Sequence, residues 1–95
     1  MFLKDLAQIS KGTLLGESLN VNDFSIDSRS IKKGQLYIAL KGDNFDGHDF
    51  VEEAIKKGAS AVVISKDLKG DFPRIVVKDT KEFINSIAAN NRKEF

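Results

Sequence analysis

The fold of this chain is decided by residues 35–64, which read QLYIALKGDNFDGHDFVEEAIKKGASAVVI. Two compact apolar runs, residues 35–40 and 61–64, lie on either side of a segment with helical periodicity. The short length of these runs and their flanking glycines favour buried strands over helices. A strand, a helix and a second strand in this order normally form a right-handed parallel crossover. The stretch therefore predicts a parallel strand–helix–strand unit.

The predicted helix inside this unit begins at Asp49 and ends before Gly58. Asp49 and Glu52 have the spacing of a capping box, and glycine is the typical residue just past a helix end. Apolar residues recur at helical spacing and predict its buried face, namely Phe50, Val51, Ala54 and Ile55.

Upstream of this unit, the sequence predicts one helix and one extended segment. Residues 2–10 have helical periodicity, and Gly12 follows as the expected stop. Residues 19–26 alternate imperfectly between apolar and polar, so a turn or bulge is expected at Asn22 and Asp23.

Downstream, residues 65–72 predict a charged turn and residues 74–77 a further short strand. Asp79 and Glu82 repeat the capping-box spacing before a last helix, which we expect to reach about Arg92. The element order predicts an α/β fold, a small mixed β-sheet flanked by helices. The order of the strands in that sheet cannot be read from the sequence.

Composition excludes several classes of protein. A length of 95 residues predicts a single domain over residues 1–95. The 15 basic and 14 acidic residues nearly balance and are dispersed along the chain. This balance argues against a nucleic-acid-binding domain, which needs a basic surface. With no cysteine and one histidine, no disulfide, zinc–thiolate or multi-histidine metal site is predicted. No apolar run approaches the roughly 18–20 residues of a membrane span, so we expect a cytoplasmic domain.

The loop at residues 41–48, KGDNFDGH, is the first candidate for ligand binding. It follows a predicted strand and leads into a helix N-terminus, where ligands tend to bind in open α/β sheets. It exceeds the roughly two to six residues usual for such a connection, and it places polar groups around one aromatic residue, Phe45. A purely structural interpretation stays open, in which Asp46 and Asp49 cap turns while Phe45 folds under the loop.

Two further features carry alternative interpretations. His48, the single histidine, suits an acid–base group or a pH switch, or a hydrogen-bonding residue that orients a helix start. Residues 27–30, DSRS, suit a ligand-anchoring turn in which Arg29 pairs with a phosphate or carboxylate, or a polar turn with a salt bridge. Neither a Gly-Lys-Ser/Thr phosphate loop nor a Gly-x-Gly-x-x-Gly motif is present. No catalytic residue and no metal ligand is predicted.

These segments occur together in a specific combination, and together they resemble the start of the Mur ligases. The resemblance runs over nearly the whole chain and is strongest from Phe24 to Ile64. The stretches that carry it are IDSR at 26–29, IKKG at 31–34, LYIALKG at 36–42, NFDGHDF at 44–50 and KGA at 57–59.

The resemblance implies one domain of a three-domain, cytoplasmic ligase of peptidoglycan synthesis. In such an enzyme the first domain holds the UDP end of a UDP-N-acetylmuramoyl-peptide, and the central domain binds ATP and magnesium. The partners implied are this nucleotide-linked peptide and the remaining domains of the same ligase. No cofactor is expected in these 95 residues, which end before any Gly-Lys-Thr loop. We therefore expect a substrate-recognition domain that performs no ligation alone.

The resemblance also implies roles for particular residues. Ser28 would contact the UDP portion, and Asp43 and Asn44 would border the uracil, on which Phe45 suits stacking. Arg29 and a lysine of the loop suit the diphosphate charge, while the DGH segment shapes the helix start. The full set of predicted substrate-binding residues is Ser28, Arg29, Lys41, Gly42, Asp43, Asn44, Phe45, Asp46, Gly47 and His48.

Three functions remain open from the sequence. Phe45 before the DGHDF stretch favours the branch of the family that adds a D-alanyl-D-alanine dipeptide. The sister branch, which adds lysine or diaminopimelate as the third amino acid, shares the same motifs. A stand-alone, non-catalytic α/β binding or interaction module is the alternative of another class, because a fold does not fix a function.

Overall fold

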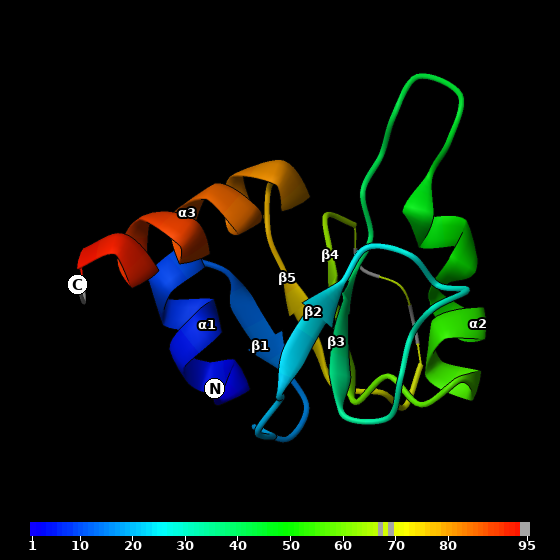
Figure 1. The fold of residues 1–95 in the computed structure, drawn as a ribbon, viewed down its shortest axis with the longest axis horizontal. Helices are drawn as coiled ribbons and strands as arrows, with labels where there is room; N and C mark the ends of the chain where they lie inside the picture. The colour runs from blue at the N-terminus through cyan, green and yellow to red at the C-terminus, as the bar shows by residue number, and fades with distance from the viewer. Residues whose placement is uncertain (67, 69, 94–95) are drawn as a thin grey trace.

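The computed structural model describes residues 1–66, 68 and 70–93, within which three α-helices and one 3-10 turn surround a five-stranded sheet (Figure 1). The strand order is β1-β5-β4-β3-β2, with β1 antiparallel to β5 and all other neighbours parallel. In chain order the elements are α1 (Leu3–Ser10), β1 (Thr13–Leu15), β2 (Asp23–Ser25), β3 (Gln35–Ile38), the 3-10 turn η1 (Gly47–Phe50), α2 (Val51–Lys56), β4 (Ala61–Ile64), β5 (Arg74–Val76) and α3 (Thr80–Lys93). The predicted mixed α/β fold is confirmed.

The strand–helix–strand unit forms as predicted. β3 and β4 are parallel neighbours, with Leu36 opposite Ala61 and Ile38 opposite Val63, and α2 lies between them in the chain. All four residues of β4 are buried, as expected for a strand covered on both faces.

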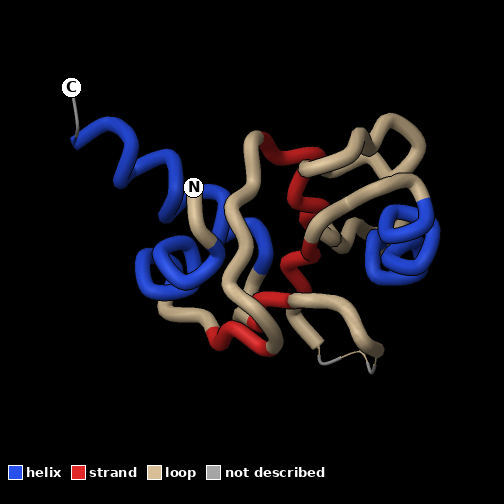
Figure 2. Tube along the Cα trace, turned by 90° about the horizontal axis from the view of Figure 1, so that it is seen from below, coloured by secondary structure: helices blue, strands red, loops and turns tan. Residues whose placement is uncertain are grey.

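Helices cover both faces of the sheet, as Figure 2 shows with α1 and α3 on one side and α2 on the other. Because successive side chains of a strand point to opposite faces, β3 contributes to two apolar clusters. Leu36 and Ile38 pack with buried residues of α1 and α3, whereas Tyr37, together with Ala39 just past the strand end, packs with Val51 and its neighbours on the α2 side. The domain thus has three layers.

The sequence did not predict β1, and it predicted too long a strand at 19–26. β1 is three residues long and pairs with β5, so that Thr13 lies opposite Val76, more than 60 positions away. A strand this short carries no readable periodicity, because it is defined by its distant partner. Of the extended segment, only Asp23–Ser25 pairs as a strand, and Asn20 makes an isolated bridge with Phe2.

The end of α1 differs from the prediction. Lys11, not Gly12, adopts the left-handed conformation at the helix end, with φ 59°. Gly12 serves close packing instead, because a Cβ there would lie 2.7 Å from Cγ1 of Val77 and 2.9 Å from Cγ2 of Ile75. Gly58 does adopt a positive φ, 115°, after α2 as expected.

The start of the second helix also differs, and the predicted capping box at Asp49 and Glu52 is wrong. The 3-10 turn Gly47–Phe50 precedes α2, and Asp46 caps that turn by accepting the backbone N–H of His48. Asp49 lies inside the turn, so it has no helix end to cap. α2 itself begins after Phe50 without a side-chain cap.

At the start of α3, half of the predicted capping box forms. Asp79 Oδ1 accepts the backbone N–H of Lys81 at 2.8 Å, but within the described chain the Glu82 side chain makes no reciprocal bond. The helix runs to Lys93, close to the expected end. Of the predicted charged turn at 65–72, residues 67 and 69 lie outside the described residues. Within the described part of the chain, no helix is long and apolar enough to cross a membrane.

Candidate ligand-binding groove

Parallel pairing brings the two candidate segments together. β2 and β3 are parallel neighbours, so the turn after β2 and the loop after β3 emerge at the same edge of the sheet. Between them lies an open groove of about 530 Å³. It is lined by Ile26, Asp27, Ser28, Arg29, Phe45, Phe50 and Glu53. The groove lies beyond the carboxyl ends of parallel strands, the edge at which open α/β sheets tend to bind ligands.

Asp27 organises the turn that forms one wall of the groove. Its Oδ1 accepts the backbone N–H of Arg29 at 2.9 Å and lies 3.3 Å from Arg29 Nε. These bonds, the backbone bond foremost, lower the pKa of the Asp27 carboxyl below its ordinary value. Arg29 is 83% exposed, and its terminal guanidinium nitrogens have no partner among the described residues. The predicted salt bridge and a free cationic surface therefore coexist in one turn.

Ser28 is the most enclosed residue of the groove, with 6% of its surface exposed. Its hydroxyl has no hydrogen-bond partner in the part of the chain that the structure describes. Yet no side-chain nitrogen or oxygen there is both fully buried and unpartnered, so the hydroxyl keeps contact with open space, which the groove supplies. A hydroxyl both donates and accepts, so Ser28 offers a ligand both kinds of bond.

Aromatic rings form the opposite wall. The rings of Phe45 and Phe50 stack with centroids 5.4 Å apart and an interplanar angle of 13°. Phe45 and Ile26 are 51% and 53% exposed, which is unusual for large apolar residues that border the same hollow. The structural interpretation that folded Phe45 under the loop is therefore wrong. This wall offers a flat apolar surface to a ring-shaped ligand.

The acidic groups of the groove are each paired with a cation. Glu53 lies 3.4 Å from Lys57 Nζ, and the same ammonium donates to the Arg29 backbone carbonyl at 3.2 Å. Asp27 pairs with Arg29. The two carboxylates are therefore offset locally, although both pairs are exposed and individually weak.

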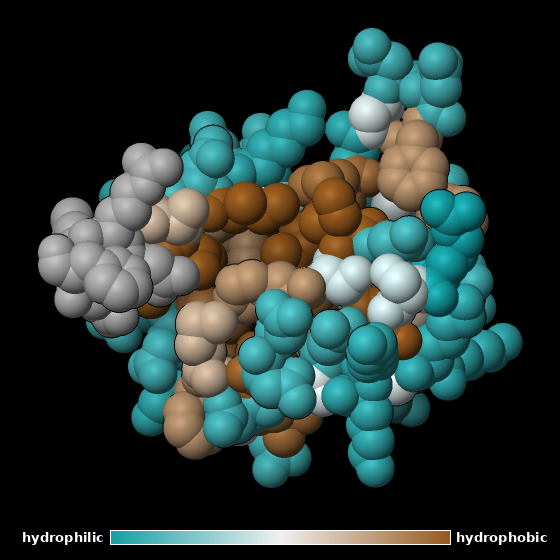
Figure 3. Space-filling view, in the orientation of Figure 1, coloured by the Kyte–Doolittle hydropathy of each residue, from teal (hydrophilic) through white to brown (hydrophobic). Residues whose placement is uncertain are grey.

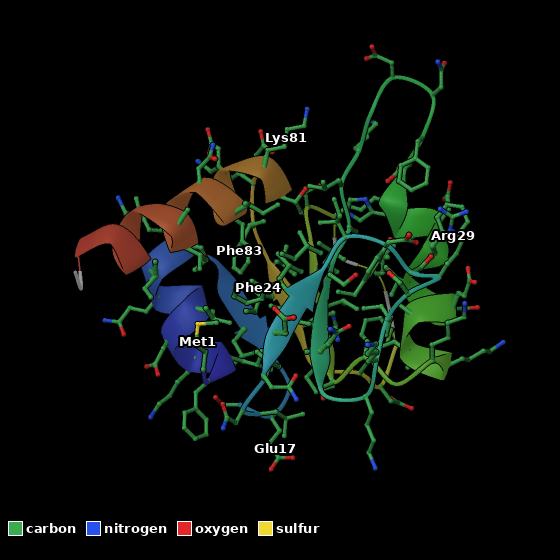
Figure 4. All side chains as sticks on the ribbon, in the orientation of Figure 1. Met1, Glu17, Phe24, Arg29, Lys81 and Phe83 are labelled. Atoms are coloured by element: carbon green, nitrogen blue, oxygen red, sulfur yellow. The ribbon has the colours of Figure 1, made fainter. Side chains whose placement is uncertain are left out.

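The loop after β3 is a projecting hairpin, which we define as residues 41–46. Lys41 and Asp46 form an antiparallel bridge, and the Gly42 N–H donates to the Phe45 carbonyl at 2.6 Å. Figure 4 shows the hairpin standing out from the body of the domain. Asp43 and Asn44, at its tip, are exposed. Residues 41–44 are exposed and do not line the groove, whereas Phe45 does.

Gly47 and His48 lie at the base of the hairpin and are buried. Neither lines the groove. A Cβ on Gly47 would meet the Leu40 backbone nitrogen and oxygen at 2.8 Å each and Tyr37 Oη at 3.0 Å. The Tyr37 hydroxyl donates to the Gly47 carbonyl at 2.8 Å. Of the predicted set, the groove therefore gathers Ser28, Arg29 and Phe45.

Sequence reasoning did not assign Ile26, Phe50 and Glu53 to the site, although all three line the groove. Phe50 was expected to lie inside the helix face, and Ile26 inside a strand. A signal for two of them exists, because Phe50 and Glu53 are three residues apart and therefore share one side of a helical segment. For Ile26 the signal is its position directly before the DSRS turn.

A second hollow, of about 160 Å³, lies where α3 crosses the sheet, within the apolar patch visible in Figure 3. Its lining residues are all apolar: Phe24, Ile38, Phe83, Ile84, Ile87 and Ala88. It has no group that could orient a polar ligand. Among the described residues, no three His, Cys, Asp or Glu side chains lie together in a way that could hold a metal ion.

Comparison with known proteins identifies the family. The profile of the Mur ligase family, catalytic domain, matches residues 20–92. The UDP-N-acetylmuramoyl-tripeptide–D-alanyl-D-alanine ligase of Escherichia coli is 37% identical over 97% of this chain, and that of Buchnera aphidicola is 41% identical over 97%. A UDP-N-acetylmuramoyl-L-alanyl-D-glutamate–2,6-diaminopimelate ligase of Aquifex aeolicus is 40% identical over 72%. The chain spans 20%, 20% and 14% of these relatives, respectively.

Solved structures show the same fold. A UDP-N-acetylmuramoylalanyl-D-glutamyl-2,6-diaminopimelate–D-alanyl-D-alanyl ligase of Acinetobacter baumannii superposes with a TM-score of 0.85 over 96% of this chain and 21% of its own, at 24% identity. The MurF ligase of Thermotoga maritima, solved in complex with ADP, gives a TM-score of 0.70 over 79% of this chain and 18% of its own, at 29% identity. The chain belongs to the Mur ligase family.

Proposed function

We propose that this chain is the UDP-binding, N-terminal domain of a ligase that adds D-alanyl-D-alanine to a UDP-N-acetylmuramoyl-tripeptide. The observation that carries the proposal is the groove in which the enclosed, unpartnered hydroxyl of Ser28 shares a hollow with the exposed ring of Phe45. Uracil has a flat face that stacks and an edge that both donates and accepts hydrogen bonds. The groove offers a surface for each.

Each lining residue takes a distinct part in this proposal. Phe45, backed by Phe50, stacks on the base, and Ser28 hydrogen-bonds the nucleotide. The exposed guanidinium of Arg29 offsets diphosphate charge at the groove mouth. Because both carboxylates of the groove are already paired, they oppose an anion less than free carboxylates would.

The other predicted residues enter the proposal less directly. Lys41, Gly42, Asp43 and Asn44 stay candidates, because the hairpin that carries them borders the groove through Phe45. Asp46, Gly47 and His48 act from the hairpin base, where two of the three are buried.

ATP and magnesium do not fit the residues of this chain. No phosphate-loop sequence is present, and the described residues offer no acidic or histidine cluster for a metal ion. In our proposal, these cofactors bind elsewhere in a longer cytoplasmic ligase, and this domain alone binds the nucleotide but forms no amide bond.

The sister ligase, which adds diaminopimelate, is the second candidate, because such a ligase of Aquifex aeolicus is 40% identical to this chain over 68 residues. Both substrates share the UDP end, so the groove cannot discriminate between them. The two candidates can be distinguished with a complete ligase that carries this domain. Its amide formation is assayed with D-alanyl-D-alanine and with diaminopimelate. Turnover only with diaminopimelate would favour the sister ligase.

The test of nucleotide binding is an amide NMR titration with UDP, with ADP as the control diphosphate. We expect saturable shifts at Ser28, Arg29 and Phe45 with UDP, and smaller shifts with ADP. Equal shifts with both nucleotides would reduce the groove to a general anion site. Silence at millimolar UDP would mean a binding free energy weaker than about −4 kcal/mol and would contradict the proposal.

A pair of serine variants tests the hydroxyl. Ser28→Ala should weaken UDP binding by roughly two- to tenfold, which is what one lost hydrogen bond costs. Ser86→Ala is the matched control, because Ser86 lies on α3 beside a different hollow. If the wild-type domain and both variants bind UDP with equal affinity, Ser28 does not contribute to the binding site.

A further inference from the structure

His48 is held through both of its ring nitrogens. Nδ1 lies 2.6 Å from Asp46 Oδ1, and Nε2 accepts the backbone N–H of Ser65 at 2.9 Å. The side chain is 2% exposed. Such a doubly bonded, enclosed imidazole has a fixed orientation.

These partners determine where the imidazole proton sits. The backbone amide of Ser65 can only donate, so Nε2 must be the bare, accepting nitrogen. Nδ1 then carries the proton and donates it to the Asp46 carboxylate. Ser65 Oγ, 3.3 Å from Nε2, can add a second donor. The geometry therefore requires the neutral Nδ1–H tautomer.

This chain of bonds ties the hairpin and the 3-10 turn that directly follows it to the end of β4. Asp46 closes the hairpin through its bridge with Lys41, His48 lies in the 3-10 turn before α2, and Ser65 directly follows β4. Asp46 also accepts the backbone N–H of His48 at 3.0 Å, and its Oδ2 lies 3.4 Å from Lys66 Nζ. We call the linked side chains of Asp46 and His48, with the Ser65 amide, the latch.

The latch lies next to the aromatic wall of the groove but outside the groove itself. Phe45 directly precedes Asp46, and Phe50 follows His48 by two residues, so both ring-bearing residues flank it in sequence. His48 instead borders a different hollow, of about 270 Å³, together with Phe72. His48 would therefore not contact a ligand in the groove, and it could affect binding only by setting the position of the aromatic wall.

We propose that His48 is a positioning residue, whose Nδ1–H tautomer fixes Asp46 against the end of β4 and thereby holds Phe45 stacked on Phe50 as the aromatic wall of the nucleotide groove. The inference rests on the proposed function for its effect on binding. His48 itself would touch no ligand. Its hydrogen bond with Ser65, 17 residues farther along the chain, would set the geometry of the aromatic wall.

Two variants each remove one half of the latch. His48→Gln keeps an acceptor for the Ser65 amide but loses the Nδ1 donor, whereas His48→Asn keeps a donor toward Asp46 but does not reach Ser65. Thr80→Ala is the matched control, because Thr80 is also a buried polar residue, 3% exposed, but starts α3. We expect both His48 variants to weaken UDP binding about fivefold to tenfold and Thr80→Ala to leave it unchanged.

A double-mutant cycle separates positioning from a general loss of structure. If His48 acts through the wall, His48→Gln should lose its effect on UDP affinity in a Phe45→Ala background, because the wall it positions is gone. The same fold-loss in both backgrounds would overturn the proposal. Unchanged affinity of His48→Gln in the parent background would do so as well.

Two NMR readouts stand independently of UDP binding. Imidazole nitrogen shifts of the wild-type domain should show a protonated Nδ1 and a bare Nε2. The nuclear Overhauser contacts between the Phe45 and Phe50 rings should weaken in both His48 variants and persist in Thr80→Ala. Persistent contacts in the His48 variants would overturn the latch, whereas absent UDP binding by the wild-type domain, with these readouts as expected, would refute only the nucleotide assignment.

Discussion

The base and the tip of one hairpin differ in what fixes them. At the base, Gly47 and His48 are buried and bonded to Tyr37 and Ser65, which belong to or follow other strands. At the tip, Asp43 and Asn44 are exposed, and their side chains have no hydrogen-bond partner among the described residues. The base is therefore specified by the fold, and the tip is free for contacts outside the domain.

Glycine substitutions should reveal this contrast most strongly. Gly47→Ala should destabilise the domain by about 3 kcal/mol, near the upper end of the usual cost of overpacking, because its Cβ would meet rigid Leu40 backbone atoms at 2.8 Å. Gly42→Ala should change stability by less than about 0.5 kcal/mol, since the nearest atom is 3.8 Å away. Urea unfolding measures both, and equal losses would contradict the distinction between base and tip.

Removing the Tyr37 hydroxyl should cost less. Tyr37→Phe leaves the Gly47 carbonyl without its 2.8 Å donor, which should lower the free energy of unfolding by about 1.5 kcal/mol. The measurement is urea unfolding at neutral pH. An unchanged midpoint would show that the buried bond contributes nothing to the base.

The same hydroxyl predicts an alkaline limit to stability. Burial, chiefly, raises the pKa of Tyr37 from 10.0 to about 12. Between these values the unfolded chain has released the proton and the folded chain has kept it, so stability falls as pH rises. Tyr37 is the only tyrosine and there is no tryptophan, so absorbance reports its titration directly. A pKa near 10 in the folded domain would contradict the buried contact.

An acidic limit should depend on Asp46. Bonds from the His48 backbone N–H first, and from its ring, lower the pKa of this carboxyl from 3.8 to about 2. Because the unfolded chain takes up its proton first, the contribution of these bonds is complete above about pH 4 and is lost as pH falls toward 2. Asp46→Asn should flatten this part of the stability profile. Asp43→Asn, at the tip, should leave its shape unchanged, and identical profiles for the two variants would refute the assignment.

The smallest effect is expected at the tip itself. Asn44→Ala should alter the free energy of unfolding by less than about 0.5 kcal/mol, because it removes an exposed side chain without a partner. Its effect on UDP affinity should be smaller than that of Ser28→Ala, since Asn44 does not line the groove. A larger affinity loss at Asn44, measured by calorimetry, would show that the tip closes over the nucleotide.

Local patterns made the main part of the fold predictable. The apolar runs that became β3 and β4 are short, continuous and bounded by turn residues. The parallel pairing of β2 with β3 was not predicted, and it is this pairing that places the loops after the two strands at one edge and brings Ser28 and Phe45 to the same groove. For the DSRS turn, the structure shows the salt bridge of Asp27 and Arg29, which was one of the two alternatives predicted from the sequence. The other alternative, a turn that anchors a ligand, stays part of our proposal.

Distant contacts set the features that the sequence did not reveal. β1 exists because Thr13–Leu15 pair with β5. A segment of three residues is too short for its sequence pattern to predict this pairing. The 3-10 turn displaced the expected helix start because Asp46 bonds His48, and His48 in turn depends on where β4 ends. Without the strand register, neither the orientation of His48 nor the stacking of Phe45 on Phe50 follows from spacing.

Intermolecular nuclear Overhauser contacts in the UDP-saturated domain would locate the bound base. We expect contacts from the uracil H5 and H6 protons to the rings of Phe45 and Phe50 and to Ile26, all of which line the groove. Contacts confined to the hairpin tip, or to the hollow between α1 and α3 at Val77 and Phe83, would contradict the proposed site.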